Sequence, residues 1–332
     1  MTKRFAVVIG VGSLLLLPMT SARAAPKAPS CGAIITGALK LKADLVCRSG
    51  HGLVVSGGAT LNCGGHRITG GNQAGQYGVY VRDGAKAVVT NCIAEGFEVG
   101  IRLRGAKGVT VSDSVARDNL RYGIEVTQQS TGALIQGNQV LDNGDEGIHL
   151  SGPVDQDAGH KILDNTIEGN LAEGIYLFLS NGSLIAGNTI RDHGAAGIYI
   201  KGSARNTIDG NTLINDPLQL VYGSQQNVLT DNIVVGQQIR FKEAFNNYVY
   251  NLSVRADGGR PSVAYDFMSS SDNLVVDSQA MKPGDYDIRA TTNSTNNVFT
   301  RFSVPARLDC SVDKSSSVSV TNRGGATLAC GR

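Results

Sequence analysis

The stretch GIYLFLSNGSLIAGNTI, residues 174–190, is echoed 23 positions later by GIYIKGSARNTIDGNTL, residues 197–213. Each copy opens with a glycine and alternating apolar residues, and closes with a short apolar phrase around an asparagine. Alternation with a period of two predicts short β-strands, and the Gly, Ser and Asn between them predict turns. Self-similarity at a fixed period is the signature of a repeat architecture.

The glycine phrase occurs six times, as GVYV 78–81, GIRL 100–103, GIEV 123–126, GIHL 147–150, GIYL 174–177 and GIYI 197–200. Without its glycine, the pattern continues as LQLV 218–221, IRFK 239–242, VAYD 263–266 and IRAT 288–291. No period holds a helical stripe. Because such short strands cannot bury an apolar face alone, stacking of successive coils is required. The sequence predicts an all-β fold, a single right-handed parallel β-helix (solenoid) of roughly ten coils.

A second phrase recurs in register as LIQGNQV, KILDNTI, LIAGNTI, TIDGNTL and VLTDNIV. It aligns five asparagines: Asn138, Asn165, Asn188, Asn211 and Asn232. Asparagine tolerates tight turns, and stacked side-chain amides can hydrogen-bond from one coil to the next. This column is predicted to be structural.

Composition is consistent with one ordered solenoid. The 332 residues include 42 glycines, no tryptophan and 41% apolar residues, so the core is built from small side chains and turns. The formal charge is +2. Once the basic residues of the leader described next are removed, the chain is close to neutral, which gives no support to nucleic-acid binding.

The first residues resemble a targeting signal. Lys3 and Arg4 precede an apolar run from Phe5 to Leu17, and Ala22-Arg23-Ala24 fits a cleavage site. The run is too short to span a bilayer comfortably, and no second one of spanning length follows. We expect a signal peptide at 1–24 and an exported protein, periplasmic or extracellular, with no membrane span. The expected layout is an N-terminal cap at 25–50, the parallel β-helix at 51–305 and a C-terminal β cap at 306–332.

Export makes disulfides permissible for the six cysteines. Cys31 with Cys47, and Cys310 with Cys330, are each placed to staple one end of the fold. The central pair, Cys63 and Cys92, is either a third disulfide or two buried thiols, because six cysteines allow fifteen pairings.

The repeat resembles that of the pectin-lyase-like superfamily of right-handed parallel β-helix proteins. It is similar in particular to the branch of carbohydrate-binding and sugar-hydrolase β-helices, polymannuronate C5-epimerases and NosD-type periplasmic proteins. The similarity covers roughly residues 50–300, and the phrases CGAIITGALKLKADLVC (31–47) and LNCGGHRITG (61–70) are similar to the start of exported members. The resemblance implies polysaccharide as the partner, or a NosD-like accessory or scaffold role without turnover. Only Met268 and Met281 remain as methionines after the leader, which argues against direct copper binding.

If the Ile and Leu of each glycine phrase point inward, the residue between them points outward. The outward positions form a column of Tyr80, Arg102, Glu125, His149, Tyr176, Tyr199, Gln219 and Arg240, with a second column of Arg82, Arg104, Thr127, Ser151, Phe178, Lys201 and Lys242. Such a row of phenols and cations suits sugar rings. The alternative is ordinary cross-strand pairing, with Arg102 and Glu125 as an exposed ion pair. The predicted substrate-binding residues are Tyr80, Arg104, Glu125, Phe178, Tyr199 and Lys201.

Within this row, His149 is the candidate base, Arg102 or Arg104 the group that neutralises a uronate carboxylate, and Tyr176 or Tyr199 the second proton carrier. The superfamily's uronate lyases and epimerases use residues of these types, so we expect a polysaccharide lyase or C5-epimerase if the protein is an enzyme, although an epimerase DPHD motif is absent. Glycoside hydrolysis by two of the residues Glu125, Asp145, Glu146 and Glu173 ranks below it.

The coil that contains His149 is the longest of the regular ones, and its excess lies in GPVDQDAGH, residues 152–160. Insertions into a repeat tend to collect on a functional face, so this segment is predicted to flank the site. Its acids, with those just before His149, give a candidate calcium site: Asp145, Glu146, Asp155 and Asp157. Calcium is the only cofactor candidate.

Overall fold

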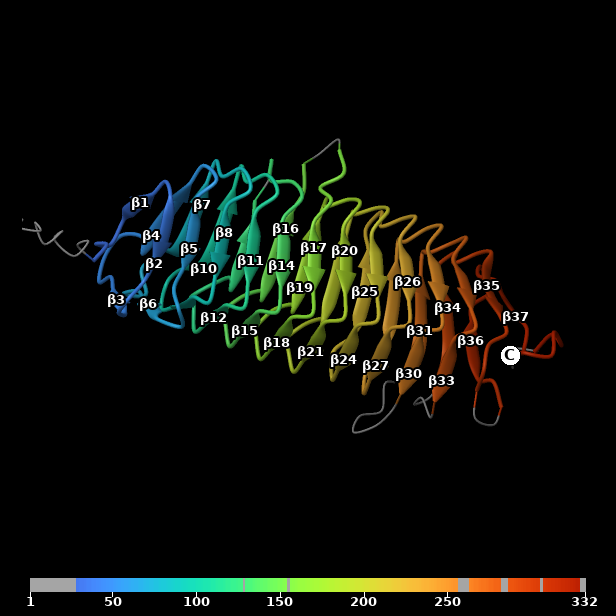
Figure 1. Ribbon diagram of the computed structural model, residues 1–332. Helices are drawn as coiled ribbons and strands as arrows, with labels where there is room; N and C mark the ends of the chain where they lie inside the picture. The colour runs from blue at the N-terminus through green and yellow to red at the C-terminus, as the bar shows by residue number, and fades with distance from the viewer. Residues whose placement is uncertain are drawn as a thin grey trace, which may run out of the picture.

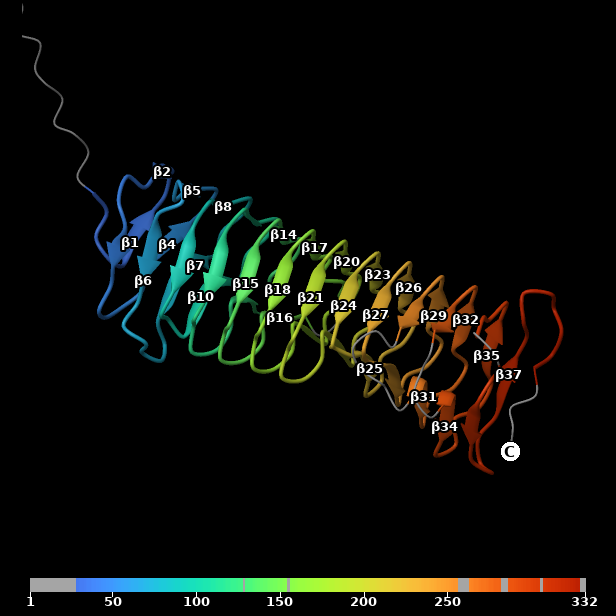
Figure 2. The ribbon, with the colours of Figure 1, turned by 90° about the horizontal axis from the view of Figure 1, so that it is seen from below.

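A computed structural model describes residues 28–127, 129–153, 156–255, 263–281, 286–304 and 307–328. Its strands run through three parallel sheets in turn, A, B and C, once per coil, and Figures 1 and 2 show the coils stacked along one long axis with β1 and β37 at opposite ends. The expected signal peptide, residues 1–24, lies outside the described residues. No helix in the described part of the chain has the length and apolar character needed to cross a membrane.

Sheet A has 13 strands, in the order β1 (Ala33–Ile35), β4 (Leu53–Ser56), β7 (Tyr77–Arg82), β10 (Val99–Arg104), β13 (Ile124–Val126), β16 (Ile148–Ser151), β19 (Ile175–Phe178), β22 (Ile198–Lys201), β25 (Leu218–Val221), β28 (Ile239–Lys242), β31 (Val263–Met268), β34 (Tyr286–Thr291) and β36 (Cys310–Val312). Sheet B has 13 strands, β2 (Ala38–Lys40), β5 (Thr60–Asn62), β8 (Val88–Thr90), β11 (Thr110–Ser112), β14 (Leu134–Gln136), β17 (Lys161–Leu163), β20 (Leu184–Ala186), β23 (Thr207–Asp209), β26 (Val228–Thr230), β29 (Tyr248–Tyr250), β32 (Leu274–Val276), β35 (Asn297–Thr300) and β37 (Val318–Val320). Sheet C has 11, β3 (Leu45–Val46), β6 (Arg67–Thr69), β9 (Ile93–Glu95), β12 (Val115–Arg117), β15 (Gln139–Leu141), β18 (Thr166–Glu168), β21 (Thr189–Arg191), β24 (Thr212–Ile214), β27 (Ile233–Val235), β30 (Ser253–Arg255) and β33 (Gln279–Met281).

The predicted all-β parallel solenoid is confirmed, with more coils than the expected ten. The described residues form sheets of 13, 13 and 11 strands. The difference arises at both ends: β1 in the segment expected as an N-terminal cap already pairs with β4, and β36 in the expected C-terminal cap pairs with β34. Residues in these segments therefore contribute rungs of their own.

The repeated glycine is required by close approach of consecutive coils. A Cβ on Gly147 would lie 2.7 Å from the carbonyl oxygen of Gly174 and 2.8 Å from Nδ2 of Asn170. The Ile that follows each such glycine is fully buried, as Ile148 and Ile175 illustrate. Glycine thus lets consecutive coils approach closely at the position just before the buried Ile.

The predicted asparagine column is buried and hydrogen-bonded from coil to coil, as expected for a structural ladder. The backbone N–H and Nδ2 of Asn165 both donate to Oδ1 of Asn188, at 3.0 and 2.9 Å. Asn188 donates in turn to Oδ1 of Asn211 at 2.8 Å. Each side chain replaces the backbone partners that a turn leaves unsatisfied.

Two further asparagine ladders were not recognised in the sequence. One joins Asn119, Asn143 and Asn170 at the turn that enters sheet A. The other runs through Asn206, Asn227, Asn247, Asn273 and Asn297 at the turn that enters sheet B. Every turn of the coil therefore has a buried amide column along part of its length.

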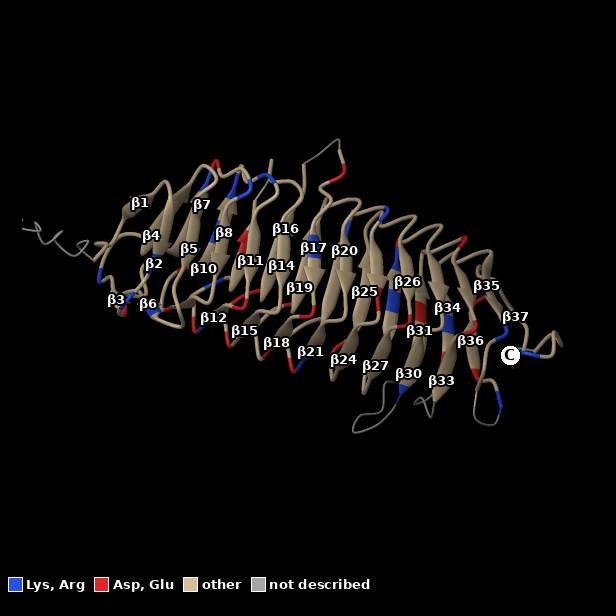
Figure 3. Cartoon of the chain, in the orientation of Figure 1, with Lys and Arg blue, Asp and Glu red and all other residues tan. Residues whose placement is uncertain are grey.

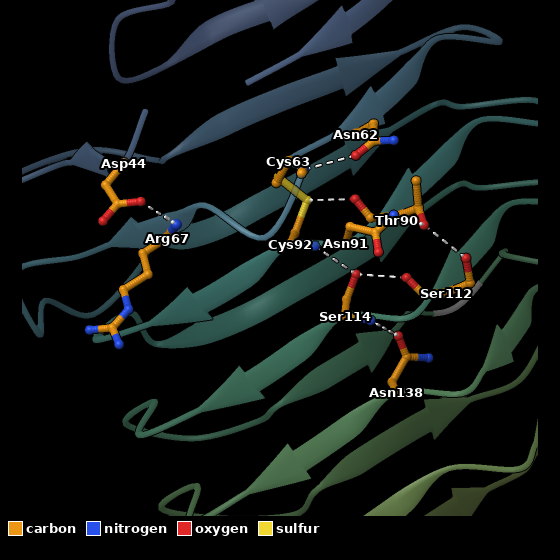
Figure 4. The surroundings of a disulfide bond; sticks show 11 residues. Asp44, Asn62, Cys63, Arg67, Thr90, Asn91, Cys92, Ser112, Ser114 and Asn138 are labelled. Carbon is orange, nitrogen blue, oxygen red and sulfur yellow. Dashed lines mark hydrogen bonds between the residues drawn. A yellow bond between two sulfur atoms is a disulfide. The ribbon is translucent and has the colours of Figure 1, made fainter. Parts of the chain in front are cut away.

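Two disulfides are present near the N-terminal end: Cys31–Cys47 and Cys63–Cys92. The central pair is thus a disulfide and not two thiols. In Figure 4 the backbone N–H of Cys92 donates to Oγ of Ser114 at 3.1 Å, and the N–H of Ser114 donates to Oδ1 of Asn138 at 3.0 Å. The bridge therefore stands at the head of the buried ladder. Cys310 is disulfide-bonded, and Cys330 lies outside the described residues.

Candidate functional site

The outward column of sheet A is in register, as the alternation predicts. Arg102 lies opposite Tyr80 on one side and Glu125 on the other, and His149 lies between Glu125 and Tyr176. The column continues through Tyr199, Gln219 and Arg240. Residues on consecutive strands are about 4.8 Å apart, so these side chains form one continuous row across the face of sheet A visible in Figure 1.

His149 is enclosed by this row, with its side chain 13% exposed. Its ring stacks on Tyr122 with centroids 4.7 Å apart and leans on Tyr176 at 5.2 Å. Nδ1 lies 3.4 Å from Oε1 of Glu146, and Nε2 lies 2.9 Å from Oγ of Ser151. A carboxylate only accepts, so the pairing with Glu146 favours the proton on Nδ1 and leaves Nε2 to accept from the Ser151 hydroxyl.

Aromatic side chains extend the row on both sides of His149. Tyr176 contacts Tyr199 at 5.5 Å and stacks on Phe178 at 6.3 Å. The ammonium group of Lys201 sits 5.6 Å above the Phe178 ring. Such rings offer flat apolar faces with polar rims, the surface that sugar rings pack against.

A second aromatic cluster lies towards the N-terminus. His51 stacks on Tyr77 at 4.8 Å, and Tyr77 meets Tyr80 edge-on at 5.2 Å. The Arg102 guanidinium covers the Tyr77 ring at 4.5 Å and donates to its hydroxyl at 2.5 Å. Arg102 thus packs against this second cluster.

The Arg102 side chain is also held by Glu125. Nε of Arg102 lies 3.2 Å from Oε2 of Glu125, although the angle is too poor for a hydrogen bond and both atoms are buried without another partner. Burial raises the pKa of Glu125, and the positive charge of Arg102 opposes that rise. The predicted carboxylate-neutralising residue is therefore already engaged by a carboxylate of its own chain.

Acidic residues gather at the edge where the chain enters sheet A. The register of β13, β16 and β19 places Tyr122, Glu146 and Glu173 one after another, and the N–H of Gly147 donates to the carbonyl of Glu173 at 2.9 Å. Glu146 and Glu173 are therefore about one strand spacing, 4.8 Å, apart along the backbone.

The two carboxyls of this pair differ in pKa. Burial, with the negative charge of Glu146 added, raises the pKa of Glu173. For Glu146 burial is the largest single effect and acts upward, but the hydrogen bond from His149 and the charge that this ring carries when protonated, together with further hydrogen bonds, outweigh it and lower the pKa. Their surroundings thus keep Glu173 protonated to a higher pH than usual and keep Glu146 ionised to a lower pH than usual.

Asp145 completes this acidic edge. Burial and the adjacent Glu146 raise its pKa. Arg121 lies between Asp145 and Glu98, 3.5 Å from each, and its guanidinium contacts the hydroxyl of Tyr122. Burial raises the pKa of Tyr122 to about 12, and that of Tyr176 to about 12.

The residues predicted as calcium ligands are not brought together. Asp145 and Glu146 precede β16, whereas Asp157 follows it and pairs with Arg205 at 2.6 Å. Asp155 lies outside the described residues. Within the described ranges, no group of three or more Asp, Glu, His or Cys side chains is arranged to hold a metal ion.

Three residues of the site escaped the sequence prediction: His51, Tyr77 and Tyr122. They stand before the apolar pairs of the repeat, where the alternation of inward and outward positions has not yet begun. A usable signal existed for Tyr122, because it precedes the repeated glycine just as Glu146 and Glu173 do.

The insertion at 152–160 begins directly after Ser151, the last residue of β16, close to His149. It ends directly before β17, so it lies at the edge between sheets A and B.

A family model described as a right-handed β-helix region matches residues 130–322, more than half of the chain, and the chain belongs to that family. A second model, for the periplasmic copper-binding protein NosD, matches residues 46–194. Among curated proteins, the tail spike protein of Salmonella phage epsilon15 is 31% identical over 117 residues, which are 30% of this chain and 11% of the phage protein.

Among solved structures, the catalytic domain of a GH87 α-1,3-glucanase in complex with nigerose superposes with a TM-score of 0.60 at 14% identity, over 89% of this chain and 63% of that chain. The catalytic unit of the thermostable GH87 α-1,3-glucanase from Streptomyces thermodiastaticus strain HF3-3 gives 0.54 at 15% identity, over 88% and 61%. The chain thus spans less than two thirds of these neighbours, and at such identities the likeness concerns the fold. By their names, these neighbours act on a polysaccharide.

Proposed function

We propose that this protein is exported and binds polysaccharide along the outward face of sheet A, with a processing site at Glu146, His149 and Glu173. The observation that carries the proposal is the meeting of a continuous aromatic row with a pair of carboxyls whose pKa values are shifted in opposite directions. Sugar rings stacked on Tyr176 and Tyr199 run past that pair. The Cys63–Cys92 disulfide fits an oxidising compartment outside the cytoplasm.

The reaction that this arrangement favours is hydrolysis of a glycosidic bond. Glu173, with its raised pKa, is the general acid that protonates the leaving oxygen. Glu146 is ionised and provides the second carboxylate, held in place by His149. Backbone positions one strand spacing apart suit the short separation of a retaining pair, in which the second carboxylate attacks the anomeric carbon and water later releases the sugar.

Uronate lyase or C5-epimerase chemistry, with His149 as base and Tyr176 as second proton carrier, is the second candidate. The acceptor role of Nε2 of His149, which lies 2.9 Å from the Ser151 hydroxyl, favours it. Against it stand the charges: Glu125, Asp145, Glu146 and Glu173 surround His149, while Arg102 is engaged by Glu125. A uronate carboxylate placed at His149 would be repelled, so a neutral sugar fits this position better.

The test is incubation of the purified mature protein with a panel of neutral and uronate polysaccharides. New reducing ends without unsaturated products report hydrolysis, unsaturated products report elimination, and C5 inversion is followed by NMR. Hydrolysis is expected to fall by about 100-fold or more in Glu173→Gln and to persist in Glu168→Gln, whose carboxylate pairs with Arg191 on sheet C. Elimination or inversion lost in His149→Ala would replace hydrolysis by the second candidate.

Two further outcomes of this test distinguish a binding role from a purely structural one. If a polysaccharide is retained but not modified, the protein binds polysaccharide without catalysis. If the protein neither modifies nor retains any polysaccharide, the proposal is overturned and a scaffold or accessory role of the NosD type remains. Export is checked separately by fractionation and by the N-terminal sequence of the mature chain, expected to begin at Ala25.

A further inference from the structure

Four cationic side chains gather at the edge between sheets A and B, opposite the acidic edge. Arg82 and Arg104 are in register on β7 and β10. In the turns that follow, the N–H of Lys86 donates to the carbonyl of Lys107 at 2.8 Å. Figure 3 shows several blue segments, which mark Lys and Arg, beside β7, β8 and β10. All four are exposed.

These cations are poorly compensated. No carboxylate of the described residues lies within ion-pair distance of any of them. Arg104 is hydrogen-bonded to the phenol of Tyr80, and Asp83 acts on it only as a more distant charge. Like charges directly opposite on neighbouring strands are unfavourable. Arg82 beside Arg104 is therefore an arrangement that fold stability does not explain.

An open pocket of about 440 Å³ adjoins this cluster, lined by Arg102, Arg104, Thr127, Gln129 and Ser151. Its lining offers guanidinium, hydroxyl and amide donors and no carboxylate. At its far end the Ser151 hydroxyl is hydrogen-bonded to Nε2 of His149. The pocket thus opens directly onto the candidate site. Arg102 is engaged by Glu125, whereas Arg104 is hydrogen-bonded to the Tyr80 phenol and has no carboxylate partner within the pocket.

We infer that this pocket binds an anionic substituent of the polysaccharide, a carboxylate or a sulfate, on a sugar unit about 10 Å towards the N-terminus from His149. The inference rests on the proposed function and names its substrate class. The chain bound is neutral where it passes Glu146 and Glu173 and acidic where it passes Arg104. A guanidinium pairs with planar or tetrahedral oxyanions through two parallel hydrogen bonds, and the surrounding cations raise the local concentration of anions.

The experiment compares matched ligands that differ only in charge. Titration calorimetry compares a neutral gluco-oligosaccharide that carries one terminal uronate with its methyl ester, and the same oligosaccharide that carries one terminal sulfate ester with its unsulfated form, at low and high NaCl. The variants are Arg104→Gln, Arg104→Lys, which keeps the charge but not the fork, and Lys314→Gln, an exposed cation near the C-terminal end as control.

The charged member of at least one pair is expected to bind more tightly than its neutral counterpart, and Arg104→Gln to weaken it roughly fivefold while leaving the neutral member unchanged. In Arg104→Gln the affinity for the charged ligand should also depend less on salt. The affinity of Arg104→Lys should lie between those of Arg104→Gln and the wild type, and that of Lys314→Gln should equal the wild-type value. Whichever pair responds distinguishes a carboxylate from a sulfate.

Equal binding of charged and neutral members would overturn the inference and leave the proposed function intact, as would an equal loss for both in Arg104→Gln. If no glycan binds, the proposed function fails. Whether the pocket binds anions is then tested by NMR of the Arg104 Nε–H group during titration with inorganic sulfate. A saturable shift supports an anion site, and no shift overturns it.

Discussion

The backbone N–H of His193 donates to Oδ1 of Asp216 at 2.9 Å, while Nε2 of His193 lies 3.9 Å from Oδ2 of Asp216, and both side chains are fully buried. The pair continues the ladder of Asn119, Asn143 and Asn170, because the N–H of Asn170 donates to Nδ1 of His193 at 3.1 Å. Nε2 and Oδ2 have no hydrogen-bond partner among the described atoms. The ladder thus ends in two ionisable groups where neutral amides precede them.

Replacing Asp216 by Asn is expected to stabilise the protein at neutral pH. Burial raises the pKa of Asp216 to about 6, above its ordinary value of 3.8. A carboxyl with a raised folded-state pKa favours folding below pH 3.8, and this advantage is lost as pH rises through 6. Relative to the wild type, the free energy of unfolding of Asp216→Asn should therefore increase by about 3 kcal/mol as the pH rises from 3.8 through 6. Urea unfolding at pH 4 and pH 8 measures it, and an equal effect at both would contradict the assignment.

Replacing Asn188 by Ala is expected to destabilise the solenoid by about 3 kcal/mol. Its side chain accepts two hydrogen bonds from Asn165 and donates to the carbonyl of Ile162 at 2.9 Å and to Oδ1 of Asn211. Truncation leaves a buried backbone N–H without a partner. Thermal unfolding checks the loss against Thr189→Ala, the exposed neighbour on β21. Equal melting temperatures would refute a ladder role.

Removing the Cys63–Cys92 bridge, by a double change to Ala, is expected to lower stability by about 3 to 4 kcal/mol, the chain-entropy value for its loop of 29 residues. Because each coil contacts only its neighbours, the loss is local. Hydrogen exchange should accelerate in β5, β8 and β9 and stay unchanged in β26 and β29. Uniform acceleration along the chain would show instead that the solenoid unfolds as one unit.

Hydrolytic activity is expected to follow a bell-shaped pH profile. The basic limb reports deprotonation of Glu173, displaced upward by its raised pKa, and the acidic limb reports protonation of Glu146, displaced downward by its lowered pKa. In Glu173→Gln the residual rate should lose the basic limb. A variant that keeps both limbs would remove Glu173 from the acid role.

Tyr176→Ala is expected to weaken oligosaccharide binding by roughly fivefold, because one aromatic platform of about 1 kcal/mol is removed. Tyr248→Ala on β29 is the matched control: this tyrosine is exposed on the outer face of sheet B. Affinity electrophoresis in gels that contain the polysaccharide compares the two. Equal losses would place the binding surface elsewhere.

The fold and the outward column follow from sequence because both depend on local periodicity. Alternation places Arg102, Glu125 and His149 on one face, and parallel pairing of equivalent repeats then fixes their order. The turn residues could not be placed in this way. Tyr122 reaches His149, and Asp216 enters a buried ladder, only because the path of each turn directs them there, and turn lengths vary between coils.

The role of Arg102 was likewise beyond the sequence. Its type and position suggested a partner for a substrate carboxylate, but Glu125 and Tyr77 occupy it from both sides. Conversely, Arg104 looked equivalent to Arg102 in sequence and proves to be the less engaged of the two. Such differences arise from side-chain competition across strands, which periodicity does not encode.

The position of Cys63–Cys92 at the head of the asparagine ladder has a consequence for biogenesis. The bridge joins the second coil to the third, in the part of the solenoid that is synthesised first. Once it closes, Ser114 and Asn138 have a fixed template on which to dock. Later coils can then be added one at a time, each completing the open edge of the last, so that assembly proceeds in the direction of synthesis.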